Sequence, residues 1–458
     1  MWLILANFTT FRFLLIFHRE FMPKPIPTFI FSFLWKSLLM WCFITLLSCK
    51  STNTFVQNAS TKMTEQEITI LAQKIHEEAL VLDAHADIAT PTISPTFLSA
   101  DGLSKVDITK LTVGGVGAVV MSVAVAPGPR TAEGDAAART EANEKLTIVN
   151  QLIKESEGTL VLSKSVADLV KAKANNQISF ILGFQNARSL EKNVSTIDSF
   201  YNAGVRIFGL NHLGHNDFSD SSRPFFDGET GRYEPDSEHG GLSTLGKAAV
   251  KRLNQLGAII DVSQLSKQAT LQTLALTTAP VIASHSNVLA ISDVTRNISD
   301  EEIDLIGKNG GVVHIAPFRA YLLGYSDPNL VAEIKTARRA AGVSEKYSYP
   351  FELYWEIADL TKRYAFLKSV SDIIGPADVD NLIDHIDYVV KRIGINHVGI
   401  GTDFNHGSGI DGYVDAADAL NVTIGLVQRG YSAKDIEKIW GGNFLRVFKA
   451  VEKKSSNK

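Results

Sequence analysis

The chain of 458 residues has a formal net charge of −4, and 45% of its residues are hydrophobic. This composition is typical of a globular protein with a full apolar core, and it argues against nucleic acid as a partner. Both cysteines, Cys42 and Cys49, lie in the first fifty residues. A metal ion bound elsewhere therefore needs His, Asp or Glu ligands, and a small molecule is the expected binding partner.

The N-terminal segment predicts a secretory signal. The apolar run Leu38–Leu47 follows Lys36 and is too short to favour a membrane span. Leu46–Cys49 resembles a bacterial lipobox, in which Cys49 would be lipidated; an uncleaved signal anchor is the alternative. We expect a signal at 1–48, a flexible tether at 49–64, a folded domain at 65–452 and a polar tail at 453–458. The protein would then lie in the bacterial cell envelope, on the periplasmic or extracellular face, and a homodimer is left open.

From residue 65 onward, short apolar runs alternate with amphipathic stretches. The runs predict eight strands, at 80–82, 118–123, 179–183, 205–210, 258–262, 281–283, 312–315 and 398–400. The stretches predict helices at 65–78, 136–154, 166–175, 242–256, 267–277 and 300–308. Eight such units predict an α/β protein with a (β/α)8 TIM barrel. A doubly wound sheet would need a glycine-rich turn after an early strand, but Val113–Gly117 precedes its strand.

The span from residue 321 to residue 387 is longer than one loop and one helix require. Tyr347–Phe351 is aromatic, and residues 378–389 are amphipathic. We expect this helical insertion to lie over the barrel mouth, because long loops after barrel strands often form lids or substrate walls.

Polar residues follow six of the eight predicted strands, at the rim where active sites of this fold lie. His85 and Asp87 end the first strand on one face, about 6.5–7 Å apart, which suits two ligands of one metal ion. The other strand ends carry Gln185 and Asn186, Asn211 and His212, Ser263 and Gln264, Ser284 and His285, and Thr402 and Asp403. One such residue could cap a helix, but histidines and carboxylates from four strands predict a shared site.

The remaining histidines favour other roles. His314 lies within a strand, and a buried, hydrogen-bonded core histidine is the favoured interpretation. His215 and His406 follow strands in loops, where each could support a ligand. His76 and His385 fall in helical stretches and are expected to be structural.

In order and spacing, these motifs resemble the membrane (renal-type) dipeptidases, zinc metallopeptidases of the amidohydrolase-like barrel superfamily. The similar segments run from about residue 75 to 451 and include Asp83–Asp87, Gly183–Asn186, Asn211–His212, Pro280–Ser286 and Gly399–Phe404. The resemblance implies a metal-dependent hydrolase barrel with two zinc ions bridged by a glutamate. One ion would lie on His85 and Asp87, and the other on histidines of strands five and six, where His285 matches.

The resemblance also implies roles in catalysis. Asp403 would handle the proton of the attacking water, and His212 would stabilise the oxyanion and contact substrate. Arg296 would pair with the C-terminal carboxylate of the substrate.

Two ligand positions depart from the family pattern. Gln185 stands where the bridging glutamate belongs, and Gln264 stands where the strand-five histidine belongs. Amide groups are poor substitutes for both ligands. Two negative charges remain, from Asp87 and Asp403, so we expect one zinc ion, completed by His285 or Gln185; two ions are the alternative.

The leading hypothesis is a metal-dependent dipeptidase whose substrates include L,L- or L,D-dipeptides. Two alternatives stay open. The first is a catalytically impaired lipoprotein that binds a peptide or cell-wall fragment, and the second is a mononuclear amidohydrolase that acts on another amide.

Overall fold

The computed structural model describes residues 63–227, 230–324, 327–342 and 357–455. The predicted signal, most of the predicted tether including Cys49, and the aromatic segment Tyr347–Phe351 lie outside these ranges. Among the described helices, none combines the length and the apolar character needed to cross a membrane.

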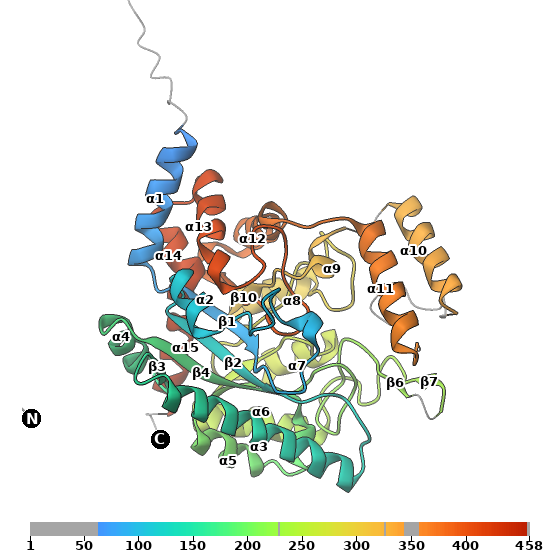
Figure 1. Cartoon of the computed structure of the whole chain (residues 1–458). Helices are drawn as coiled ribbons and strands as arrows, with labels where there is room; N and C mark the ends of the chain where they lie inside the picture. Colours follow the sequence, from blue (N-terminus) through green and yellow to red (C-terminus); the bar gives the residue numbers. More distant parts are fainter. Residues whose placement is uncertain (1–62, 228–229, 325–326, 343–356, 456–458) are drawn as a thin grey trace, which may run out of the picture. The chain divides into compact units, whose positions relative to one another are not determined.

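Eight parallel strands follow one another around the barrel in chain order. They are β1 (Leu82–Asp87), β2 (Ala118–Ala124), β4 (Ile178–Gln185), β5 (Val205–Gly209), β8 (Ile259–Asp261), β9 (Ile282–Ala283), β10 (Val312–Ile315) and β11 (Val398–Ile400). Of these, β1, β2, β4 and β10 are labelled in Figure 1. The ring is closed beyond β11, where Asp87 N donates to Phe404 O at 2.8 Å and Asp403 N donates to His85 O at 2.8 Å. Each strand overlaps a predicted run, so the predicted (β/α)8 barrel is confirmed.

Helices surround the strands, and the six predicted ones are present. They are α1 (Glu65–Glu78), α3 (Ala132–Glu155), α4 (Val166–Ala174), α6 (Thr244–Leu256), α7 (Lys267–Leu276) and α8 (Asp300–Asn309). The first illustrates how sequence sets a boundary: Glu67 N donates to the Thr64 hydroxyl at 3.2 Å, and Thr64 N donates to the Glu67 carboxylate at 2.8 Å. This capping box starts the helix. Further helices are α2 (Ile108–Val113), α5 (Thr196–Ala203), α13 (Ala419–Gln428), α14 (Ala433–Glu437) and α15 (Asn443–Ser455).

Three short strands were not predicted. β3 (Leu160–Leu162) pairs with β4, while β6 (Phe226–Asp227) and β7 (Arg232–Tyr233) form a separate antiparallel pair. Each has at most three residues, which is too short for an apolar periodicity to register.

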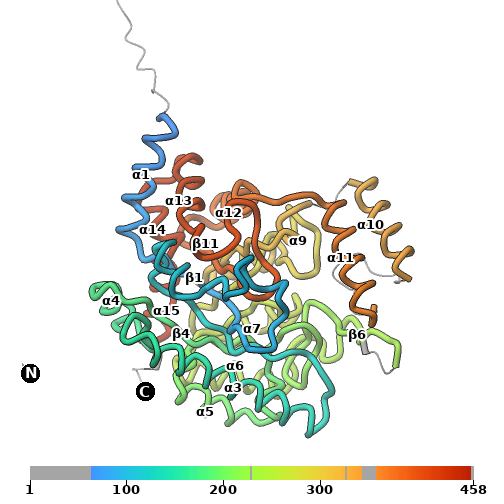
Figure 2. Tube along the Cα trace, viewed as in Figure 1, coloured from blue at the N-terminus to red at the C-terminus, as the bar shows by residue number. Residues whose placement is uncertain are grey.

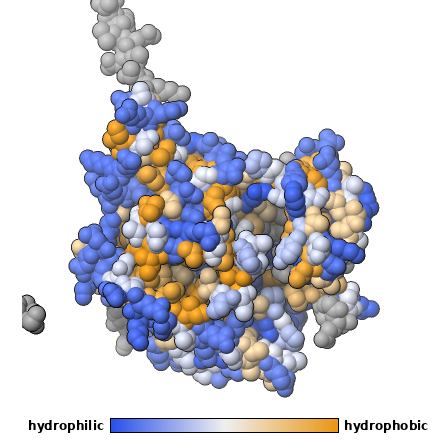
Figure 3. Space-filling view, viewed as in Figure 1, coloured by the Kyte–Doolittle hydropathy of each residue, from blue (hydrophilic) through white to orange (hydrophobic). Residues whose placement is uncertain are grey.

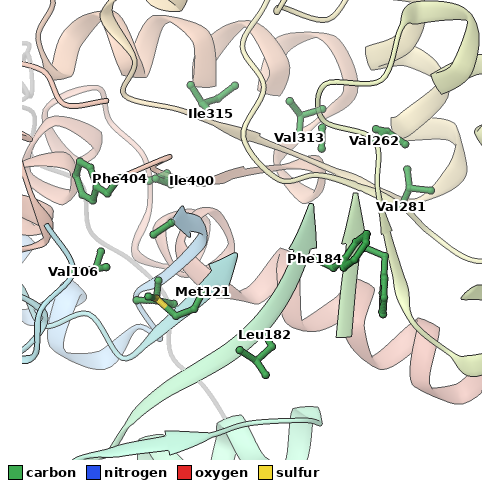
Figure 4. Close-up of a cluster of buried hydrophobic side chains, with 14 of the residues drawn as sticks. Val106, Met121, Leu182, Phe184, Val262, Val281, Val313, Ile315, Ile400 and Phe404 are labelled. Atoms are coloured by element: carbon green, nitrogen blue, oxygen red, sulfur yellow. The ribbon is translucent and has the colours of Figure 1, made fainter. Parts of the chain in front are cut away.

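Two buried clusters fill the barrel and its surroundings. The larger one joins strand residues such as Met121, Leu182 and Phe184 to the outer helices (Figure 4). The smaller one joins alternate strand residues, including Leu82 and Ala118, to apolar side chains of α15. Because α15 contacts β8, β10 and β11 as well as α4 and α6, it covers the barrel end opposite the polar strand ends.

The long insertion is only partly as predicted. It forms α9 (Arg319–Leu322), α10 (Pro328–Ala340) and α11 (Leu360–Ile374), and the last two lie side by side, apart from the ring of barrel helices (Figure 2). The expectation was wrong for residues 378–389. They belong to α12 (Val379–Ile393), which packs on β10, β11, α8 and α13 as a barrel helix. Its buried face carries Leu382, Ile383, Ile386 and Val389, and an amphipathic pattern alone does not say which apolar surface such a face covers.

Candidate active site

The polar strand ends meet at one end of the barrel. The structure brings together all seven predicted metal-site and catalytic residues, and each is at most 7% exposed. They are His85, Asp87, Gln185, His212, Gln264, His285 and Asp403. Polar groups are buried at a cost unless they find partners, so this concentration needs a specific explanation.

His85, Asp87 and Asp403 form a group suited to one cation. His85 Nε2 lies 3.5 Å from Asp87 Oδ1 and 3.8 Å from Asp403 Oδ1. His85 Nε2 and Asp87 Oδ1 are buried and have no hydrogen-bond partner among the described residues. One imidazole nitrogen beside two carboxylates is a donor set that zinc accepts, so the residues present fit such an ion.

The carboxylates of this group differ in their surroundings. Burial acts to raise the pKa of Asp87, but the His406 charge and its 2.8 Å hydrogen bond hold that pKa well below its usual range. Burial raises the pKa of Asp403, with opposition from His406 and His85. The two acids are therefore suited to different tasks, one as a constant anion and the other as a proton carrier.

His285 lies in a hydrogen-bonded cluster of a different kind. Its Nε2 is 3.4 Å from Gln185 Nε2 and 3.3 Å from Gln264 Nε2, and Arg223 donates to Gln264 Oε1 at 3.2 Å. Its ring stacks on that of His85 with 3.7 Å between centroids. The pKa of His285 lies well below its usual range because of burial and the charges of His85 and Arg296.

A second possible ligand group joins His85 and His285 to Asp261. The Asp261 carboxylate, however, accepts from Ser263 N and Ser284 N at 2.9 Å each and from the Ser284 hydroxyl at 2.5 Å. It ties the ends of β8 and β9 together. The Asp261 oxygens are therefore already engaged, and the positions of the bridging glutamate and the strand-five histidine that the resemblance implies are held by Gln185 and Gln264.

His212 and His406 form one wall of the site. Their Nε2 atoms are 3.3 Å apart, and His212 Nδ1 is buried without a hydrogen-bond partner among the described residues. Burial, His406 and Arg223 hold the pKa of His212 well below its usual range. A neutral His212 can donate one N–H to a substrate oxygen.

Arg296 lies behind the site. It is 2% exposed, and it donates to His285 O at 2.7 Å and to the Ser286 hydroxyl at 3.4 Å. Its charge opposes the rise in the pKa of Asp403, so the guanidinium acts on the centre. It does not line either of the two pockets that open beside the site.

Comparisons with known proteins identify the family to which this site belongs. Residues 70–458 match the family model of the membrane dipeptidases, peptidase family M19. The chain belongs to this family. The predicted resemblance is confirmed, and membership places the chain among the peptidase hydrolases.

The chain is also similar to individual dipeptidases and to solved structures. Dipeptidase aclJ of Aspergillus oryzae is 29% identical over 312 residues, which cover 68% of this chain and 60% of that protein. The crystal structure of the probable dipeptidase PvdM from Pseudomonas aeruginosa is 32% identical, with a TM-score of 0.75 over 85% of this chain and 99% of that one. A metallo peptidase of Rhodobacter sphaeroides, liganded with a phosphinate mimic of the dipeptide L-Ala-D-Ala, shares the fold at 19% identity, with a TM-score of 0.62 over 81% of this chain and 99% of that one.

Histidines expected to be structural lie in the core. His314 Nδ1 pairs with Ala283 O at 3.0 Å, and burial lowers its pKa to about 4. His385 accepts from Val288 N at 3.0 Å and pairs with Leu322 O at 3.0 Å. His76 contacts the Thr423 hydroxyl at 2.6 Å and Gly114 O at 2.7 Å. His215 accepts from Ser221 N at 3.0 Å and so holds the loop that follows His212.

Some site residues escaped prediction. Arg223 lies in the long loop after β5 and also donates to the Tyr321 hydroxyl at 3.1 Å. Phe97 stacks on His406 with 5.6 Å between ring centroids. No local periodicity in the sequence indicates that such loop residues reach the site. His406 was noted as a possible supporting residue because it lies three residues after Asp403.

Proposed function

We propose that the protein is a metal-dependent dipeptidase with one zinc ion on His85 and Asp87. The observation that carries this proposal is the pair of buried, unpartnered ligand atoms, His85 Nε2 and Asp87 Oδ1, 3.5 Å apart and facing Asp403. When bound, such an ion lowers the pKa of a water toward about 7 and polarises a carbonyl.

The surrounding side chains supply the remaining chemistry. Asp403 accepts the proton of the attacking water and delivers it to the leaving amine, a role that suits its raised pKa. His212 donates an N–H to the developing oxyanion, a contribution of about 3–4 kcal/mol in comparable sites. Arg296, which the resemblance pairs with the C-terminal carboxylate of the substrate, lines neither pocket, so its buried charge attracts that carboxylate from a distance. Blocking the carboxylate is expected to lower kcat/KM, and an unaltered value would contradict the assignment.

One ion rather than two follows from the glutamines. A neutral amide at Gln185 does not bridge two dications, and Gln264 is engaged by the cationic Arg223 at 3.2 Å. The positive charge of Arg223 beside that position disfavours a second cation.

A second candidate function is a binding protein for peptides or cell-wall fragments that has lost hydrolysis. The two glutamines favour it, because they remove two ligands that the family pattern supplies. A third is a mononuclear amidohydrolase acting on another amide, since barrels of this type host many reactions through their loops.

Elemental analysis of the purified domain, combined with hydrolysis assays on L,L- and L,D-dipeptides, separates these functions. One ion per chain with dipeptide turnover supports the main proposal. Two tightly bound ions would overturn the mononuclear site, and an ion-free protein without turnover would support the binding protein. The L,D substrates are included because the Rhodobacter sphaeroides relative was crystallised with an L-Ala-D-Ala mimic.

We further propose that the chain is anchored by a lipid on Cys49 in the bacterial envelope, facing the periplasm or the exterior. The lipobox-like Leu46–Cys49 supports this. Membrane fractionation of the wild type and Cys49→Ala tests it: a variant that stays membrane-bound would favour the signal anchor. Light scattering would test the homodimer.

A further inference from the structure

Two pockets open from the catalytic centre, and they differ in size. The smaller one, of about 300 Å³, includes Asp87, and the larger one, of about 750 Å³, extends along α11. Both are bordered by His212 and His406, so the two pockets adjoin at these histidines. Pockets for drug-sized ligands span about 300–1,000 Å³, and the larger pocket alone exceeds the needs of a dipeptide of small residues.

Helix α11 contributes one wall of the larger pocket. Its apolar lining residues Tyr364, Leu367 and Ile374 follow helical spacing. Leu367 and Ile374 are partly buried against the cluster that Phe366 shares with α10, and they also border the pocket. The helix therefore holds these two side chains in place from behind, while Tyr364 remains 49% exposed.

The opposite wall is aromatic. It includes Phe225, Phe318 and Tyr321, and the last two stack with 4.2 Å between ring centroids. The surface is hollowed between α11 and the body of the barrel (Figure 3). Apolar groups on both sides of an open space suit an apolar ligand group, because its burial between them removes apolar surface from water.

The charges of the larger pocket suggest how a peptide is oriented. Apart from histidines, the charged residues described along this pocket are Arg223, Arg319 and Lys368, all basic. In the smaller pocket, Glu141 is paired with Lys145 at 3.1 Å, and Asp87 is a ligand of the proposed zinc ion. A peptide at the centre is therefore best matched with its carboxylate end toward the larger pocket.

We infer that the larger pocket binds a bulky apolar side chain, aromatic or long aliphatic, on the C-terminal residue of the substrate. This inference rests on the proposed dipeptidase function and adds a side-chain specificity to it. Leu367 and Ile374 of α11 are the specificity-determining residues.

Kinetics on three dipeptides test the inference. Burial of a phenylalanine side chain predicts a kcat/KM for Ala-Phe at least about tenfold above that for Ala-Ala. Phe-Ala should not share this gain. Leu367→Ser should lower kcat/KM for Ala-Phe about fivefold more than for Ala-Ala. The matched control is Leu360→Ser on the same helix, where the side chain is 57% exposed and does not line the pocket; both values should match the wild type.

Binding measurements keep this result separate from the proposed function. In the Asp403→Asn protein, calorimetry should show tighter binding of Ala-Phe than of Ala-Ala, and Leu367→Ser should reduce the difference. Selective binding without any turnover in the wild type would support the pocket and overturn the dipeptidase. Equal affinities, or a preference for Phe-Ala, would overturn the inference while leaving the dipeptidase intact.

Discussion

Restoring the two missing family ligands should create a second metal site. The amide nitrogens of Gln185 and Gln264 lie 3.4 and 3.3 Å from His285 Nε2. A carboxylate at 185 and an imidazole at 264 would therefore lie within reach of an ion on His285. We predict that the double variant Gln185→Glu/Gln264→His binds two zinc ions per chain where the wild type binds one.

The magnitude follows from the charges. Two unit charges about 4 Å apart attract by about 4 kcal/mol at an effective dielectric constant of about 20, so a carboxylate attracts a divalent ion by about 8 kcal/mol. Desolvation and repulsion from Arg223, which contacts position 264 at 3.2 Å, remove part of this gain. A net gain of about 3 kcal/mol corresponds to about two orders of magnitude in affinity for the second ion.

Zinc titration followed by calorimetry measures the stoichiometry directly, and elemental analysis after dialysis checks it. Gln255→Glu is the matched control, because it adds the same charge on the exposed face of α6. Its stoichiometry should stay at one. A double variant that folds but still binds one ion would refute the reasoning, and so would a wild type that already binds two.

Three further predictions concern single residues. Asp403→Asn should lower kcat by about 10²–10⁴ while zinc content stays near the wild-type value; unchanged turnover would exclude the proton-transfer role. His406→Phe removes the 2.8 Å bond to Asp87 and should weaken zinc binding about 10–100-fold in a chelator competition, whereas unchanged affinity would show that Asp87 needs no such support. Burial lowers the pKa of His385 to about 4 in the folded protein, so unfolding takes up a proton below pH 6.5. About 3 kcal/mol of stability should be lost between pH 6.5 and 4, and a denaturation series in which His385→Gln kept the wild-type slope would contradict this.

The barrel could be predicted because its signals are local. Each strand is a short apolar run. A barrel fold places the polar residues at or after the strand ends at its rim, as His85, His285 and Asp403 show. The positions of α11, α12 and Arg223 depend on contacts between segments far apart in the chain. The amphipathic pattern of α12 fits any apolar surface, and nothing near Arg223 in sequence indicates its bond to Gln264.

The centre has two halves that differ in hydrogen bonding: the cluster of His285, Gln185, Gln264 and Arg223, and the group of His85, Asp87 and Asp403. This difference bears on whether the protein is an enzyme or has lost catalysis. Gln185 and Gln264 contact His285, and Arg223 completes the cluster, so this half is satisfied without a second ion. His85 Nε2 and Asp87 Oδ1, by contrast, are buried without hydrogen-bond partners among the described residues. Buried unpartnered groups destabilise a fold by about 1–3 kcal/mol each, a cost that a bound ion would offset. Their presence beside Asp403 and His212 favours an enzyme that uses one ion over a protein that has lost catalysis.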